Sequence, residues 1–271
     1  MTGLPPIDIA IAYPEPRFPG DVEPGRTSRI ALQHLARHDG SHDYAYSWGY
    51  TIFRTVYGPG SDEDVAKALD RLAAYAKFFA QKEHACPVVG QGAFDARPNE
   101  ELWSRYRCEL VQDEQTLADA SESEVGERFD AWIRQRRRPF TTAYPVPNAR
   151  FLFCLMLDDE SLENILALPE DPRAPANYGG AADEDDEGGE GWIKVISNRM
   201  RSEEEEGESG RYWLRVGITD YLWPMWFYPF DPDAMLEEMG WRDAEDGVQN
   251  LWGRPTDWFE EMMAAGSGYD G

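Results

Sequence analysis

One stretch of the chain, residues 151–157, has no polar side chain and reads F-L-F-C-L-M-L. A strand with one solvent-facing side alternates apolar and polar residues, whereas a strand covered on both faces is apolar throughout. The run therefore predicts a central strand buried on both faces of a sheet. No other segment constrains the fold as strongly.

Alternation and helical spacing predict the elements around this strand. β-branched and aromatic residues that alternate indicate strands, and apolar residues three and four apart indicate helices. The predicted strands cover residues 48–57, 105–111, 151–157, 192–200 and 211–219. The predicted helices cover residues 27–38, 61–79 and 125–133, with a short helix after Asp158. The last two strands favour an antiparallel hairpin, because that pairing needs no crossover helix.

The order of these elements predicts an α+β fold, with helices packed on a mixed, largely antiparallel sheet. A ferredoxin-like core is one arrangement that fits this order. We expect a Pro-rich extended arm over residues 1–26 and an α+β domain over 27–219, with acidic loops at 183–190 and 203–208. An aromatic-rich, Trp-rich C-terminal extension over 220–271 is expected to pack on the same domain.

The charge of the chain limits its partners. The sequence has 26 Lys and Arg against 51 Asp and Glu, which gives a net charge of -25. Nucleic-acid binding depends on cations that neutralise phosphates, and anionic membranes repel acidic surfaces. Direct nucleic-acid binding and membrane association are therefore disfavoured. No apolar run is long enough for a transmembrane helix.

The cysteines indicate the compartment. Cys86, Cys108 and Cys154 are an odd number without C-x-x-C spacing, so neither a disulfide framework nor a zinc cluster is indicated. The N-terminus also lacks the basic and long apolar regions of a secretory signal. We expect an intracellular protein, cytoplasmic or nuclear, that has no cofactor.

Three charged residues are candidates for ligand binding. Arg54 lies in the middle of an apolar and aromatic strand, so it needs an anionic partner if it is buried. Asp158 and Asp159 follow the most apolar strand, a common place for functional carboxylates. Each residue has a structural alternative: Arg54 could pair with a carboxylate of the fold, and the two aspartates could cap a helix.

A histidine series is the only indication of a metal. His34 and His38 are four residues apart, so one helix face could present both to a divalent cation. Gly40 is placed to end that helix before His42, and no H-E-x-x-H motif is present. The alternative is a polar helix end, where the helix dipole favours imidazolium.

Aromatic residues concentrate near the C-terminus, where residues 221–230 read Y-L-W-P-M-W-F-Y-P-F. Trp and Tyr are common energetic centres of protein interfaces. We therefore take Trp223, Trp226, Phe227 and Tyr228 as a candidate interface. Packing against the sheet is the alternative.

Residues 48–62, W-G-Y-T-I-F-R-T-V-Y-G-P-G-S-D, resemble a strand-to-helix motif of a large group of uncharacterised proteins from filamentous ascomycete fungi. Residues 151–162 and the strand G-W-I-K-V at 191–195 are also similar to that group. The likeness leaves out the acidic loops and the Trp-rich end. It implies a fungal intracellular protein and implies no activity.

These features predict a non-catalytic acidic protein that acts through protein-protein interaction in a regulatory role. The reason is that an aromatic cluster is present without a coherent catalytic set. One alternative is an enzyme or small-ligand-binding protein with a pocket around Arg54. A second is a nucleic-acid mimic whose carboxylates imitate phosphates. An Arg54 that is sealed and paired would count against the first alternative.

Overall fold

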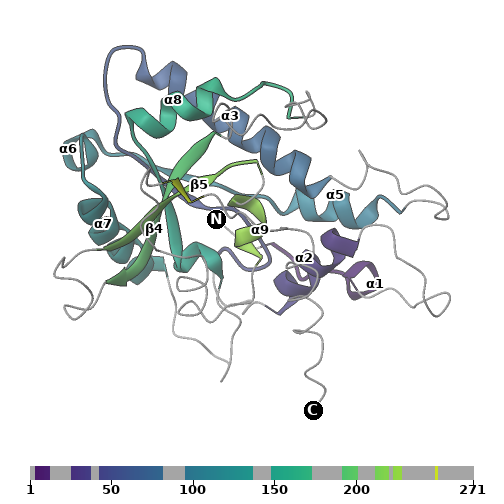
Figure 1. Cartoon of the computed structure of the whole chain (residues 1–271). Coiled ribbons are helices and arrows are strands. Elements are labelled where there is room, and N and C mark those ends of the chain that lie inside the picture. The colour runs from purple at the N-terminus through teal and green to yellow at the C-terminus, as the bar shows by residue number, and fades with distance from the viewer. Residues whose placement is uncertain are drawn as a thin grey trace.

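The structure is a computed structural model, and the segments that it describes are residues 4–12, 26–37, 43–81, 95–136, 148–172, 191–200, 211–219, 222–227 and 248–249. The elements are, in chain order, α1 (Ile9–Ala12), α2 (Arg26–Ala36), β1 (Thr51–Arg54), α3 (Ser61–Ala80), α5 (Arg97–Ser104), β2 (Glu109–Val111), α6 (Glu114–Leu117), α7 (Glu122–Arg136), the 3-10 helix η1 (Ala149–Phe151), β3 (Phe153–Leu157), α8 (Asp159–Ala167), β4 (Trp192–Met200), β5 (Arg211–Gly217), α9 (Leu222–Trp226) and β6 (Val248–Gln249). Figure 1 shows these elements arranged around one sheet.

The sheet has the strand order β2-β1-β3-β4-β5-β6. Strand β1 pairs in parallel with both neighbours, so that Thr51 lies opposite Glu109 on one side and Cys154 on the other. The β3–β4 and β4–β5 pairs are antiparallel, and the β5–β6 pair is parallel. The α+β class and the predicted hairpin of β4 and β5 are confirmed. The described strands pair about as often in parallel as antiparallel, because helices between β1, β2 and β3 supply the crossovers that parallel neighbours need.

The ferredoxin-like arrangement is not formed. From β1 the chain passes through α3 to β2 on one side, and from β2 it passes through α7 to β3 on the other side. Right-handed crossovers in opposite directions place their helices on opposite faces of a sheet. The strand order therefore reverses at β1, as it does in doubly wound sheets.

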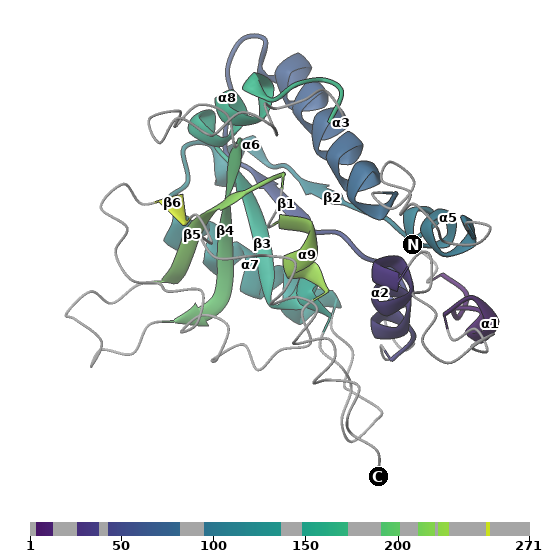
Figure 2. The same ribbon diagram turned by 45° about the vertical axis from the view of Figure 1, so that its right-hand side comes forward.

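Strand β3 explains why both faces of the sheet are covered. Its side chains alternate between two cores: Phe153, Leu155 and Leu157 face the larger core, and Cys154 and Met156 face the smaller one. Helices α2, α3, α5, α8 and α9 contribute to the larger core and α7 to the smaller one. All five side chains of β3 are buried, which confirms the prediction of a strand covered on both faces. Figure 2 shows this central strand among the helices.

Helix α9 closes the larger core and corrects the predicted interface. Trp223, Trp226 and Phe227 are 1 %, 0 % and 0 % exposed. The indole of Trp226 donates a 3.0 Å hydrogen bond to the carbonyl of Gly49 in the centre of the fold. A contact surface requires exposed side chains, so the interface prediction is wrong for these three residues. Tyr228 lies outside the described residues.

Part of the Pro-rich arm packs on the domain. The guanidinium of Arg105 donates a 2.9 Å hydrogen bond to the carbonyl of Pro5. The short helix α1 follows, and the carboxylate of Asp8 accepts a 2.9 Å hydrogen bond from the amide of Ala10 at its start. The arm is therefore not extended throughout, because Asp8 supplies a helix cap. The acidic loops at 183–190 and 203–208 lie outside the described residues.

Candidate functional site

A pocket lies where the parallel strands β1 and β3 end. The amide of Thr55, directly after β1, donates a 3.0 Å hydrogen bond to the carbonyl of Leu157 at the end of β3. In open sheets with parallel strands, ligands bind beyond the carboxyl ends of the strands where the strand order reverses. The pocket at this position has a volume of about 230 Å³. Its walls include Thr55, Asp119, Glu122, Asp158, Asp159 and Lys194.

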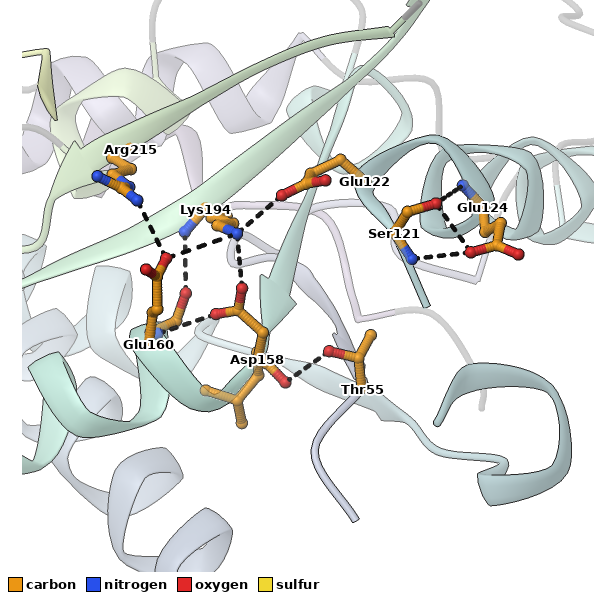
Figure 3. A network of polar contacts seen from close by, with 10 residues as sticks. Thr55, Ser121, Glu122, Glu124, Asp158, Glu160, Lys194 and Arg215 are labelled. Atoms are coloured by element: carbon orange, nitrogen blue, oxygen red, sulfur yellow. Dashed lines mark hydrogen bonds and ion pairs between the residues drawn. The ribbon is translucent and has the colours of Figure 1, made fainter. Parts of the chain in front are cut away.

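The turn before α7 forms one wall of the pocket. The amide of Asp119 donates a 3.0 Å hydrogen bond to the carbonyl of Thr55, which fixes the turn to the end of β1. Asp119 has a left-handed backbone with φ 54°, a conformation that aspartate adopts more readily than most residues. Ser121 and Glu124 then form a reciprocal capping box, with 2.9 Å and 3.4 Å hydrogen bonds between side chains and amides. The cap positions Glu122, the first residue of α7, at the pocket (Figure 3).

Asp158 has two roles in the opposite wall. One carboxylate oxygen accepts a 2.9 Å hydrogen bond from the amide of Ser161 and so caps α8, which confirms the predicted capping role. The other oxygen lies 2.7 Å from the ammonium of Lys194. Burial acts to raise the pKa of Asp158, but the bonds from Lys194 and Ser161 outweigh it and hold the pKa below its usual range. The carboxylate is therefore ionised at neutral pH.

Lys194 on β4 connects both walls. Its ammonium lies 2.7 Å from Glu122 and 2.7 Å from Asp158, and 3.8 Å from Glu160 (Figure 3). The same group lies 5.2 Å from the ring centroid of Trp213. Burial acts to lower the pKa of Lys194, but the hydrogen bonds to Asp158 and Glu122 raise it above the usual value. The lysine is therefore a fixed positive charge.

Sequence reasoning missed Lys194 and Glu122. In W-I-K-V-I a lysine between apolar residues is typical of the solvent side of a strand, and an acid at a helix start is typical of the helix dipole. The one available signal was that Lys194 falls within a segment of the hairpin that is otherwise apolar.

The pocket is negatively charged overall. Four of its residues are acids, Asp119, Glu122, Asp158 and Asp159, and one is a base, Lys194, which leaves three negative charges. Glu122 and Asp158 are engaged with Lys194. Among the described residues, no Lys or Arg forms an ion pair with Asp119 or Asp159. The predicted candidates Asp158 and Asp159 therefore lie together, in a site suited to cations.

Arg54 is sealed beside the pocket instead of lining it. Its side chain is 6 % exposed, and its Nη1 lies 2.6 Å from the carboxylate of Asp62. Its Nη2 donates a 2.8 Å hydrogen bond to the hydroxyl of Ser61, and its Nε donates one of 2.8 Å to the carbonyl of Val56. Arg54 therefore pairs within the fold, and its predicted role as a ligand clamp is wrong. The hydroxyl of Ser61 is engaged in this contact, and no side chain caps the start of α3.

His34 faces the larger core. Its ring packs edge-on against Trp226 and Phe227, with centroids 6.2 Å and 6.3 Å away. Burial, and then the charge of Arg37, lower its pKa to about 4. His38 lies outside the described residues. In the described part of the chain, no three His, Cys, Asp or Glu side chains lie close enough together to hold a metal ion.

These observations define the class: an α+β protein with a mixed sheet covered on both faces and an acidic pocket at the strand ends. No family model, no curated protein and no solved structure matches the chain. Within the described segments, no helix combines the length and apolar character needed to cross a membrane.

Proposed function

We propose that the protein binds a small cationic ligand, one that carries an ammonium or guanidinium group, in the pocket at the ends of β1 and β3. The observation that supports this is the pair of pocket acids, Asp119 and Asp159, for which no described residue supplies a cation. A cleft lined by charges of one sign focuses the electric field and concentrates counter-ions. Ligand N–H groups would donate to these carboxylates.

The volume restricts the ligand. At about 230 Å³, the pocket is smaller than the roughly 300 to 1,000 Å³ of sites that take drug-sized molecules. A short diamine or an alkylguanidine is therefore the appropriate class. The apolar side chain of Met156 lines the same pocket and provides a surface for the methylene groups of such a ligand.

The protonation states favour binding over catalysis. A general acid or base works best when its pKa lies near the operating pH. Asp158 has a pKa below its usual range, and Lys194 has one above its usual value. Both groups keep their charge near neutral pH, so the proposed role is non-catalytic.

Isothermal titration with 1,5-diaminopentane and with a matched monocarboxylate tests the proposal. Binding of the diamine should weaken about tenfold in Asp159→Asn and in Asp119→Asn, since a hydrogen bond to a charged group contributes about 1.5 kcal/mol or more. Glu163→Gln is the matched control, because Glu163 is an exposed acid of the same helix α8 and does not line the pocket. Equal affinity in all three variants would contradict the proposal, and so would binding of the carboxylate alone.

A second proposal is recognition of a basic protein, for which the net charge of -25 is the supporting observation. Opposite charges accelerate and select such encounters. The contact would involve exposed acids such as Glu63 and Asp64, which are 77 % and 46 % exposed, and not the buried tryptophans. Affinity capture with wild type and with Glu63→Gln/Asp64→Asn tests this. The proposal would be contradicted if both proteins captured the same partners and if added salt did not release these partners.

The intracellular location is also a proposal. Its support is that Cys108 is a free thiol, which is typical of reducing compartments. Fractionation of cells that express the tagged chain tests it, and recovery from the medium would contradict it.

A further inference from the structure

Arg150, in η1, is fully buried, with 0 % of its side chain exposed. Its Nη2 donates to the carbonyl of Arg107, and its guanidinium carbon lies 4.6 Å from the ring centroid of Tyr44. Its Nε and Nη1 have no hydrogen-bond partner in the structure as described. Arginine stays charged in proteins, so the interior contains a positive charge with two unused donors.

An unsatisfied buried donor is unfavourable, and a charged one is more unfavourable. A buried charge without a counter-charge is also strongly unfavourable. The contrast with Arg54 is informative, because Arg54 is also buried but has an acceptor for each of its three nitrogens. Arg150 therefore requires an acceptor that the described residues do not provide.

The carboxylate that acts on Arg150 electrostatically is Glu109, and it is already engaged. It accepts hydrogen bonds from Tyr44, from Trp132 at 3.4 Å and from Arg136 at 2.7 Å. Two guanidinium groups, those of Arg136 and Arg150, thus share one carboxylate. The cluster has a surplus of one positive charge inside a protein with a net charge of -25.

Among the described residues, the hydroxyl of Tyr106 adds a further donor beside this cluster. The hydroxyl of Tyr106 accepts a 3.0 Å hydrogen bond from the thiol of Cys108, and its own proton has no acceptor among the described residues. Burial raises the pKa values of Tyr106 and of Cys108, while the charge of Arg150 acts to lower both. Both groups therefore keep their protons and lie within electrostatic range of Arg150.

We propose that Arg150 and Tyr106 form an internal binding site for one small monovalent anion of the halide class. One negative charge balances the surplus of the cluster. A spherical ion accepts hydrogen bonds from any direction, whereas sulfate or phosphate brings more charge and needs more room. Because η1 precedes β3, the site lies at the opposite end of the strand from the pocket, and it does not depend on the function proposed above.

Crystals grown with bromide in place of chloride test the site directly. We expect an anomalous peak within hydrogen-bond distance of Arg150 and Tyr106. A water molecule alone at this position, or no peak there, would overturn the proposal.

Thermal unfolding in solution gives a second test, with chloride replaced by gluconate at constant ionic strength. Wild type should show a saturable rise in Tm with chloride, since a ligand that binds only the folded state stabilises it. Arg150→Met should lose this dependence, and Arg54→Met, a buried arginine with a full set of acceptors, should keep it. A chloride-independent Tm in wild type would overturn the proposal.

Tyr106→Phe keeps the test decisive if Arg150→Met does not fold. The loss of one hydrogen bond to an anion, about 1.5 kcal/mol, should raise the half-saturating chloride concentration about tenfold. A Tyr106→Phe protein with the chloride response of wild type would exclude the site as proposed.

Discussion

The ammonium of Lys194 lies 2.7 Å from the carboxylate of Asp158, the residue that caps α8. This contact joins the beginning of β4 to the end of β3 and fixes the start of a helix at the same point. The geometry of the pocket therefore depends on one ion pair whose side chains are 9 % and 17 % exposed.

Asp158→Asn should lower the free energy of unfolding by about 1 to 3 kcal/mol, because asparagine keeps the helix cap and loses the charge opposite Lys194. Asp158→Ala should cost about 1 kcal/mol more, because it also removes the cap. Urea denaturation measures both. Glu163→Gln is the control on the same helix. Equal stability of the Asp158→Asn and Asp158→Ala variants would contradict the two roles of Asp158, as helix cap and as ion-pair partner of Lys194.

The contribution of Asp158 should also depend on pH. Its pKa is lower in the folded protein than in the unfolded chain, so the unfolded chain takes up a proton first as the pH falls below about 4. The stability difference between wild type and Asp158→Asn should be complete near neutral pH and should disappear as the pH falls through the folded pKa. A difference that stays constant down to pH values near 2 would contradict this account.

His34 should destabilise the protein in mild acid. Its pKa is about 4 in the folded protein, and an unfolded histidine titrates near 6.5. Protonation therefore favours the unfolded chain as the pH falls from about 6.5 to 4, by up to roughly 3 kcal/mol. His34→Gln should flatten this part of the stability curve. Imidazole chemical shifts that titrate near pH 6.5 in the folded protein would show the expectation to be wrong.

Trp226 should act as a core residue. Trp226→Ala should cost about 3 to 5 kcal/mol, and Trp226→Phe should cost less because it keeps most of the packing and loses the bond to Gly49. Differential scanning calorimetry checks both variants. Trp103, which is only partly buried, is the control. A Trp226→Ala protein as stable as wild type would restore the interface interpretation.

Gly49 should not tolerate a side chain. Its φ is +113°, and an added Cβ would lie 2.6 Å from the carbonyl oxygen of Arg107. Gly49→Ala should cost at least about 2 kcal/mol from strain and overlap together. Gly58→Ala is the matched control, because nothing lies within 4 Å of its added Cβ. Similar Tm values for the two variants would contradict the expectation.

The sequence predicted those parts of the fold that depend on local pattern. The apolar run of β3 and the helical spacing of α3 were sufficient, because burial on one or two faces determines which residues a segment contains. Strand order was not predictable in the same way. Thr51 lies opposite both Glu109 and Cys154, and nothing in the alternation of β1 specifies these partners or their direction.

The site was predictable only in part, for a related reason. Asp158 could be predicted because it follows an apolar strand. Lys194 has the sequence pattern of an ordinary solvent-facing residue, and only the structure shows that the start of α7 lies beside it. Conversely, Trp223 and Trp226 have the composition of an interface, and only the packing of α9 shows them to be core. Composition indicates that a side chain needs a partner and does not indicate whether the partner is in the same chain.

The hydrogen bond from Trp226 to Gly49 joins residues that are 177 positions apart. At ribosomal rates of about 5 to 20 residues per second, the surroundings of Gly49 spend roughly 10 to 35 s without this indole during synthesis. The apolar side chains of the larger core therefore remain partly exposed until most of the chain has been synthesised. Exposed apolar surface at this stage favours aggregation or chaperone binding. The yield of folded protein in a cell should thus depend on how the nascent chain is protected, as well as on the stability of the finished fold.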